Sequence, residues 1–211
     1  MASGTSSQQP IVERSFRFRS WLARPVVGGN YRCLVIATAL LLTGTVGSGK
    51  TTTAERIAER LRSDGVAHAV VDLDAVRQFW PTPDHDRFGF EMELRNLAPL
   101  VHNYLSGGAQ RLVLAGVCET QRDRARYEEA LAVPLSVCRL RVAADILDGR
   151  LRRRHIDDAD GLCWHLARAV ELDQVLDEAA VADLELTVHD MTRDQVADAV
   201  LRIIGWTSPS Q

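Results

Sequence analysis

The chain has 211 residues, of which 46% are hydrophobic and 25% are charged, and these are ordinary values for a globular protein. This length suits a single domain with a substantial core and room for a small lid. The formal net charge of -3 gives no electrostatic footprint for nucleic acid, so we expect no nucleic-acid partner.

Residues 1–30 differ in composition from the rest of the chain. The segment begins with a polar stretch rich in serine and glutamine, and arginines among aromatic residues follow it. We interpret it as a flexible extension that forms an arm, packed on the domain or loose. A membrane-surface contact and an organelle-targeting remnant are the alternatives. We expect one folded domain over residues 31–207.

Cysteine and histidine spacing gives no sign of a metal site. No C-x-x-C occurs, and no two histidines lie four residues apart. We therefore expect buried free thiols at Cys33, Cys118, Cys138 and Cys163, as in a reducing cytoplasm. The apolar run over residues 34–42 is too short to span a bilayer, and no secretory signal pattern precedes it.

Short apolar runs alternate with helical patterns from Cys33 onward. The runs predict strands over residues 33–44, 68–74, 111–117, 135–142 and 183–188. The first and third are apolar nearly throughout, as expected of strands buried on both faces. Helical spacing follows the first strand and returns over residues 162–176. The alternation predicts an α/β fold, with helices on both faces of a five-stranded parallel sheet.

The loop after the first predicted strand reads GTVGSGKT and contains Lys50, the single lysine of the chain. It fits the pattern G-x-x-x-x-G-K-[ST] between a buried strand and an amphipathic helix. Glycines let backbone N–H groups approach a phosphate chain, and the helix directs its positive N-terminal end toward the same place. The loop thus predicts a P-loop, with nucleotide-binding residues Gly44, Thr45, Val46, Gly47, Ser48, Gly49, Lys50, Thr51 and Thr52.

The P-loop residues also indicate the nucleotide. We expect Lys50 to reach the β- and γ-phosphates, where a planar guanidinium would not replace the compact ammonium. We expect the Thr51 hydroxyl to bind Mg²⁺. Guanine-reading proteins use N-K-x-D, which a chain without a second lysine lacks. ATP with Mg²⁺ is therefore the expected nucleotide.

The second predicted strand runs into the sequence VVDLDAVR, which contains two aspartates. Because side chains alternate along a strand, Asp72 and Asp74 should point the same way at the carboxyl edge of the sheet. We predict that Asp72 holds a magnesium-bound water and that Asp74 accepts a proton from an attacking hydroxyl. The alternative is that one is a helix N-cap and the other a surface charge.

These two motifs resemble those of P-loop small-molecule kinases, a group that includes adenylylsulfate, gluconate and shikimate kinases and chloramphenicol phosphotransferase. Adenylylsulfate kinases carry D-G-D-N-V-R here, and Asp72, Asp74 and Arg77 match its aspartates and arginine; shikimate kinases have a comparable D-x-D. The resemblance follows the order of elements over residues 34–204. It implies a P-loop NTPase three-layer sandwich, in which the aspartates serve Mg²⁺, substrate and base roles and Arg77 grips the substrate.

A third segment, DILDGRLRRRH, follows the fourth predicted strand. Its R-L-x-x-R is similar to the lid of gluconate-type kinases. The resemblance implies a small lid over residues 148–165, in which Arg150 and Arg154 close over the transferring phosphoryl group. A solvated basic helix end is the alternative.

The sequence also departs from these families. The third predicted strand lacks the aspartate that ends it in many P-loop NTPases, and the adenylylsulfate kinase pattern fails after the fourth strand. Glu119 is a candidate replacement for that acid, a substrate contact or a structural residue. The resemblance to adenylylsulfate kinases implies that Arg95 corresponds to a substrate-contacting position. We expect the acceptor pocket in the aromatic-rich segment over residues 78–96.

Together these features predict a cytoplasmic ATP:alcohol phosphotransferase acting on a hydroxyl of a small molecule, either a metabolite or a natural product such as an antibiotic. Lys50, Asp74, Arg150 and Arg154 are its predicted catalytic residues. Asp74, Arg77, Arg95 and Glu119 are the predicted substrate contacts, and Thr51 and Asp72 the metal contacts. An ATP-binding or ATPase interaction module and a toxin-like nucleotide-sugar kinase are the alternatives. The oligomeric state is open.

Overall fold

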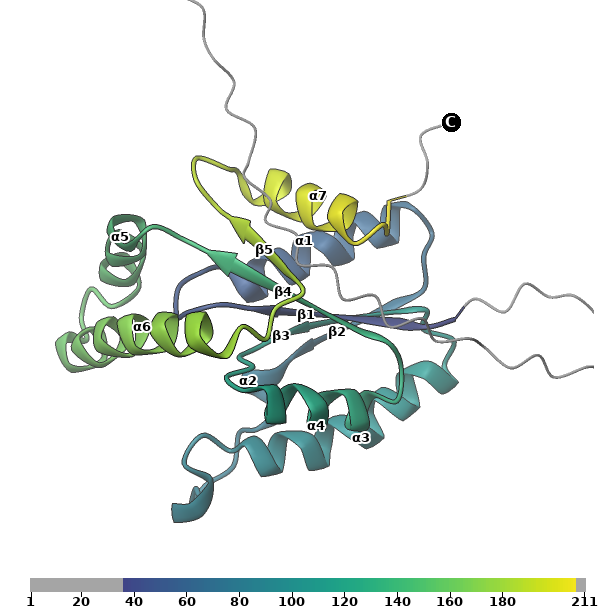
Figure 1. The fold of residues 1–211 in the computed structure, drawn as a ribbon, viewed down its shortest axis with the longest axis horizontal. Helices are drawn as coiled ribbons and strands as arrows, with labels where there is room; N and C mark the ends of the chain where they lie inside the picture. Colours follow the sequence, from purple (N-terminus) through teal and green to yellow (C-terminus); the bar gives the residue numbers. More distant parts are fainter. Residues whose placement is uncertain (1–35, 208–211) are drawn as a thin grey trace, which may run out of the picture.

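The computed structural model describes residues 36–207, so the predicted extension over residues 1–30 lies outside the described part of the chain. A five-stranded parallel sheet runs through the middle of the molecule (Figure 1). Its strands are β1 (Thr38–Thr43), β2 (His68–Asp72), β3 (Arg111–Ala115), β4 (Leu135–Arg141) and β5 (Leu184–Thr187). Their order is β2-β3-β1-β4-β5, with the P-loop strand β1 at the centre.

Helices cover both faces of this sheet (Figure 1). They are α1 (Lys50–Ser63), α2 (Leu73–Val76), α3 (Phe90–Ser106), α4 (Gln121–Leu131), α5 (Ala144–Arg154), α6 (Ala159–Ala179) and α7 (Arg193–Ile203), with a short 3-10 turn η1 (Asp84–Asp86). Apolar side chains of α1 and α7 form one core with the sheet. Side chains of α3, α4 and α6 form the other core. The predicted three-layer α/β sandwich is confirmed.

The sheet register brings the ends of three strands together. Asp72 is level with Ala115 in the β2–β3 pair, and Leu42 is level with Ala115 in the β1–β3 pair. The P-loop, the start of α2 and the segment after β3 therefore leave the sheet at one edge. Ligands of open parallel sheets bind at this carboxyl edge.

Each of the five predicted strands extends beyond the observed strand at one end or at both. Described strand geometry begins only at Thr38, and residues 33–35 lie outside the described part. β2 ends at Asp72, not at residue 74, because the Asp72 side chain accepts a hydrogen bond from the backbone of Asp74 and caps α2. In this way the N-cap carboxylate bonds to a backbone N–H that, in a continuing strand, would instead bond to a neighbouring strand.

The cysteine expectation is only partly confirmed. Cys118 and Cys138 are buried free thiols. Cys163 is exposed, because it lies on the outer face of α6, whereas Cys33 lies outside the described residues. Between residues 36 and 207 no helix combines the length and apolar character needed to cross a membrane.

Candidate functional site

The predicted P-loop joins β1 to α1, and its backbone is tightly packed at Gly44. Gly44 has φ +142°, and a Cβ added there would lie 2.6 Å from the carbonyl oxygen of Leu140 and 2.8 Å from Ser48 Oγ. No side chain larger than hydrogen fits at this position. Ser48 Oγ is buried without a hydrogen-bond partner among the described residues. A buried hydroxyl of this kind suits a loop that receives a polar ligand such as a phosphate oxygen.

Lys50, the first residue of α1, folds back over this loop. Its Nζ donates to the carbonyl oxygens of Gly44 at 3.0 Å and Thr45 at 3.1 Å. Burial, together with the positive charges of Arg77 and Arg154, lowers the pKa of Lys50 to about 8, and the negative charge of Asp72 only partly opposes this shift. The positive charges that lower this pKa also favour the binding of an anion beside the ammonium.

We expect the Lys50 pKa to report nucleotide binding directly. Negative phosphates favour the charged ammonium, so ATP should move the pKa from about 8 upward by more than one unit. Because the free amine forms as pH rises through 8, nucleotide affinity should fall above that pH. Reductive methylation with ¹³C-formaldehyde would label the single lysine for an NMR titration with and without ATP.

The Lys50→Arg variant identifies the lysine resonance in that titration, since only the α-amino signal remains in it. A midpoint near 10.5 in the free protein, or no movement with ATP, would contradict the expected burial and the P-loop interpretation together.

The predicted metal residues contact each other. Thr51 Oγ1 donates to Asp72 Oδ2 at 3.2 Å, while Asp72 Oδ1 accepts from the backbone N–H of Asp74 at 3.0 Å. Asp72 is thus a helix cap and a neighbour of the P-loop at once. A hydroxyl and a carboxylate side by side are ligands that suit Mg²⁺, so the residues present fit this ion.

Asp74 lies on α2, so the strand alternation that we used to orient it was wrong. Its exposed carboxylate forms an ion pair with the guanidinium of Arg77. Arg77 also donates to the carbonyl oxygen of Phe88 at 3.3 Å. The arginine therefore connects the predicted base with the segment that precedes α3.

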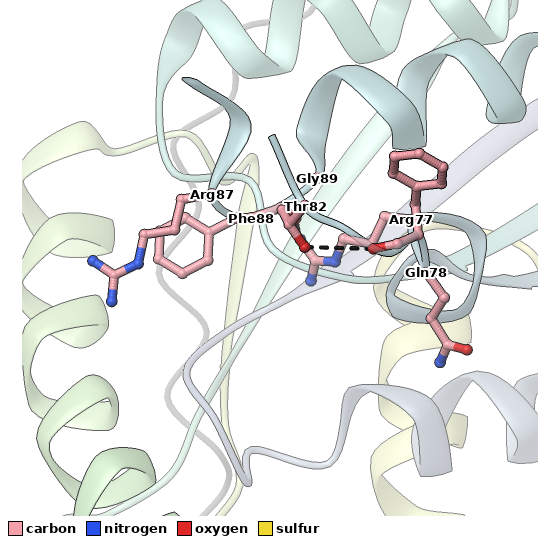
Figure 2. A pocket seen from close by; sticks show the side chains of 7 residues that line it. Arg77, Gln78, Thr82, Arg87, Phe88 and Gly89 are labelled. Atoms are coloured by element: carbon pink, nitrogen blue, oxygen red, sulfur yellow. Dashed lines mark hydrogen bonds between the residues drawn. The ribbon is translucent and has the colours of Figure 1, made fainter. Parts of the chain in front are cut away.

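A pocket of about 310 Å³ opens beside Arg77 (Figure 2). Its walls come from the segment between α2 and α3, where we expected the acceptor to bind, and consist of Arg77, Gln78, Phe79, Thr82, Arg87, Phe88 and Gly89. Phe79 and Phe88 are about half exposed. The pocket combines two guanidinium groups with two aromatic rings.

The predicted lid arginines lie on α5, which packs against the P-loop. A Cβ added at Gly47 would lie 3.3 Å from the side chains of both Leu147 and Leu151. Arg150 Nη1 donates to the carbonyl oxygens of Gly47 at 3.2 Å and Ser48 at 3.4 Å. Arg154 is exposed, and its charge acts on Lys50. Figure 1 shows α5 beyond the carboxyl edge of the sheet.

The two remaining predicted residues differ in placement. Glu119, after β3, forms an ion pair with Arg168 of α6, and the Arg168 guanidinium lies 4.8 Å from the ring centre of Phe88. Glu119 thus reaches the pocket only through Arg168. Arg95 is exposed on α3, and within residues 36–207 it forms no hydrogen bond or ion pair with the other predicted site residues.

Sequence reasoning missed several side chains around this edge. No sequence motif marks Arg168, because its ion-pair partner Glu119 is distant in sequence. Thr45 was predicted as a P-loop residue, but the motif does not reveal that its Oγ1 donates to the carbonyl oxygen of Ala169 at 2.7 Å, which fixes the P-loop to α6. Glu93 could have been found from the sequence, because it is a charged residue among the apolar residues of the buried face of α3.

Comparisons with known proteins agree with this fold. A family model described as an AAA domain matches residues 40–162. No curated protein matches the chain by sequence. The fold is similar to a gluconokinase from Sinorhizobium meliloti 1021, with 17% identity and a TM-score of 0.56 over 81% of this chain and 93% of that one.

Two other solved structures are similar in the same way. An APS kinase from Mycobacterium tuberculosis in complex with AMPPNP and APS has 21% identity and a TM-score of 0.55, over 81% of this chain and 98% of that one. A tunicamycin resistance protein from Deinococcus radiodurans has 16% identity and a TM-score of 0.59, over 82% and 99%. At such identities the likeness shows a shared fold.

Proposed function

The chain belongs to the AAA domain family, and we propose that it is an ATP-dependent kinase that transfers the γ-phosphate to a hydroxyl of a small molecule. One observation carries the proposal. Thr51 of the P-loop contacts Asp72, whose neighbour Asp74 is paired with Arg77 at the wall of the pocket. The nucleotide loop, a carboxylate and an acceptor pocket are thereby contiguous.

In the proposed reaction the acceptor hydroxyl lies in the pocket beside Asp74. Asp74 takes the hydroxyl proton, the oxygen bonds to the γ-phosphorus, and the bond from that phosphorus to the bridging oxygen breaks, so that ADP leaves. Lys50 stabilises charge on the β- and γ-phosphates. Mg²⁺, held by Thr51 and Asp72, would neutralise phosphate charge when bound.

Arg77, Arg150 and Arg154 supply the remaining positive charge in this proposal. Arg77 orients the acceptor, and the two α5 arginines offset charge on the phosphoryl group in flight. The rings of Phe79 and Phe88 favour an acceptor with an apolar or ring-shaped part. The likeness to a gluconokinase and to a tunicamycin resistance protein supports both a sugar-like metabolite and a natural product as acceptor.

The test is a screen of small hydroxylated compounds with Mg²⁺·ATP, read as ADP release and confirmed by mass spectrometry of the phosphorylated product. ADP release that depends on one compound class supports the kinase. Release without any acceptor would favour the ATPase module, whereas a nucleotide sugar as the only acceptor would favour the toxin-like kinase. We propose residues 31–207 as the catalytic domain and the cytoplasm as its location.

The lid proposal predicts a specific kinetic pattern for α5. Arg150→Ala and Arg154→Ala should each lower kcat by roughly 10²-fold with little change in either KM, because contacts made only in the transition state affect turnover alone. Hydrogen exchange over residues 148–165 should slow when a bisubstrate analogue binds.

Arg152→Ala is the matched control for these two variants, because Arg152 is exposed and paired with Asp148 on the same helix at 2.7 Å. It should leave kcat unchanged. If all three variants keep normal turnover and exchange over residues 148–165 does not respond to the analogue, α5 is only a basic helix end.

A further inference from the structure

A buried carboxylate lies directly behind Arg77. Glu93 belongs to the first turn of α3, and its side chain is only 1% exposed. It is on the core-facing stripe with Leu94, Leu97 and Val101, where apolar residues are the rule. A carboxylate at such a position requires partners that offset its loss of hydration.

Glu93 has two partners, one on each carboxylate oxygen. Oε1 accepts a hydrogen bond from the hydroxyl of Tyr127 on α4, which is equally buried. Oε2 lies 3.6 Å from Nη1 of Arg77. The carboxylate thus joins the inner face of α4 to the arginine that lines the pocket.

The Tyr127 hydroxyl makes this cluster sensitive to a proton. It also lies 3.2 Å from the carbonyl oxygen of Val117, so two acceptors compete for one hydroxyl hydrogen while Glu93 is ionised. A protonated Glu93 can donate to the tyrosine oxygen, which leaves the tyrosine hydrogen for Val117. Protonation therefore completes the hydrogen bonds on the α4 side and removes the charge that faces Arg77.

Burial of Glu93, modified by the surrounding groups, places this exchange near neutral pH. Burial raises the pKa of Glu93 to about 7, and the negative charges of Asp86 on η1 and Asp123 on α4 act in the same direction. The Tyr127 hydrogen bond and the Arg77 charge lower the pKa of Glu93 and only partly offset that effect. Both protonation states are populated between about pH 6 and pH 8.

Arg77 links this cluster to the site, because its guanidinium faces Glu93 on one side and the exposed carboxylate of Asp74 on the other. We propose that Glu93 is a positioning residue, which holds the Arg77 guanidinium against Asp74 at the pocket when ionised and releases it when protonated. Its consequence for acceptor binding rests on the proposed kinase function, but the positioning itself does not.

The first experiment therefore uses no acceptor and no nucleotide. Protein with ¹⁵N,¹³C-labelled arginine is titrated from pH 5.5 to 8.5 by carbon-detected NMR, with Arg77→Lys identifying the Arg77 guanidinium signals. We expect an inflection of these signals near pH 7 that is missing in Glu93→Gln. Arg77 signals that do not change with pH, or an inflection that persists in Glu93→Gln, would overturn the proposal.

Tyr127→Phe provides a second variant that keeps the carboxylate. The Tyr127 hydrogen bond favours the ionised form of Glu93. Its loss should therefore raise the pKa of Glu93 and move the Arg77 inflection to higher pH. If Tyr127 only filled space in the core, the Tyr127→Phe variant would keep the inflection at the wild-type pH. An unchanged or lowered inflection in a folded Tyr127→Phe protein would also overturn the proposal.

The second experiment measures transfer with an acceptor found in the screen. The acceptor KM of the wild-type protein should rise roughly tenfold from pH 8 to pH 6, and Glu93→Gln should show the higher KM at both pH values, with kcat less affected. If no acceptor is phosphorylated but the NMR inflection behaves as expected, the proposed function fails and the positioning stands. If transfer occurs and the KM of Glu93→Gln still depends on pH as in the wild type, the positioning proposal fails alone.

Discussion

Replacing Lys50 with alanine should lower phosphoryl-transfer turnover by at least about 10³-fold while leaving the fold intact, since charge stabilisation of the transferring group carries most of the catalysis in such sites. The loop closes through its own backbone: Ser48 N–H donates to the carbonyl oxygen of Thr45 at 3.2 Å, and Thr53 N–H to that of Gly49 at 2.9 Å. The side chain is not needed for these bonds.

The measurement is kcat with the identified acceptor, together with thermal unfolding of both proteins. Lys50→Arg is the matched control, since it keeps the positive charge but replaces a compact ammonium with a wide planar group. We expect it to rescue little of the lost turnover. Near wild-type turnover in Lys50→Ala would refute the P-loop interpretation.

The P-loop could be predicted because its information is local. The motif, the buried strand before it and the amphipathic helix after it are contiguous in sequence, and the glycines are explained by their own backbone geometry. Thr51 and Asp72, which the sequence predicts as metal contacts, also contact each other in the structure, because parallel strands end at a common edge of the sheet.

The other side chains of the site depend on contacts between distant segments. Arg168 meets Glu119 across 49 positions, and Tyr127 meets Glu93 across 34. No spacing rule connects such pairs, because helix packing brings them together. Asp74 shows a different failure. One capping hydrogen bond, which the Asp74 N–H donates to the Asp72 carboxylate, makes a helix of a predicted strand end, and periodicity alone does not reveal where that helix begins.

Replacing Asp74 with asparagine should lower kcat by about 10²- to 10⁴-fold, the usual contribution of a general base, with ATP affinity nearly unchanged. The Asp74 side chain is exposed and pairs with Arg77, whereas the P-loop contacts the Asp72 side chain. An amide of the same shape cannot accept the hydroxyl proton.

Asp72→Asn is the contrast that separates the two roles. Asparagine is as good an N-cap as aspartate, so α2 should persist, while the weaker oxygen ligand beside Thr51 should raise the Mg²⁺ concentration needed for half-maximal activity. Kinetics over a range of Mg²⁺ and ATP concentrations, with nucleotide affinity measured by calorimetry, distinguish the variants. If both lose kcat alike with the same Mg²⁺ dependence, or if Asp74→Asn mainly weakens ATP binding, then Asp74 is not the base and the proton must leave by another route.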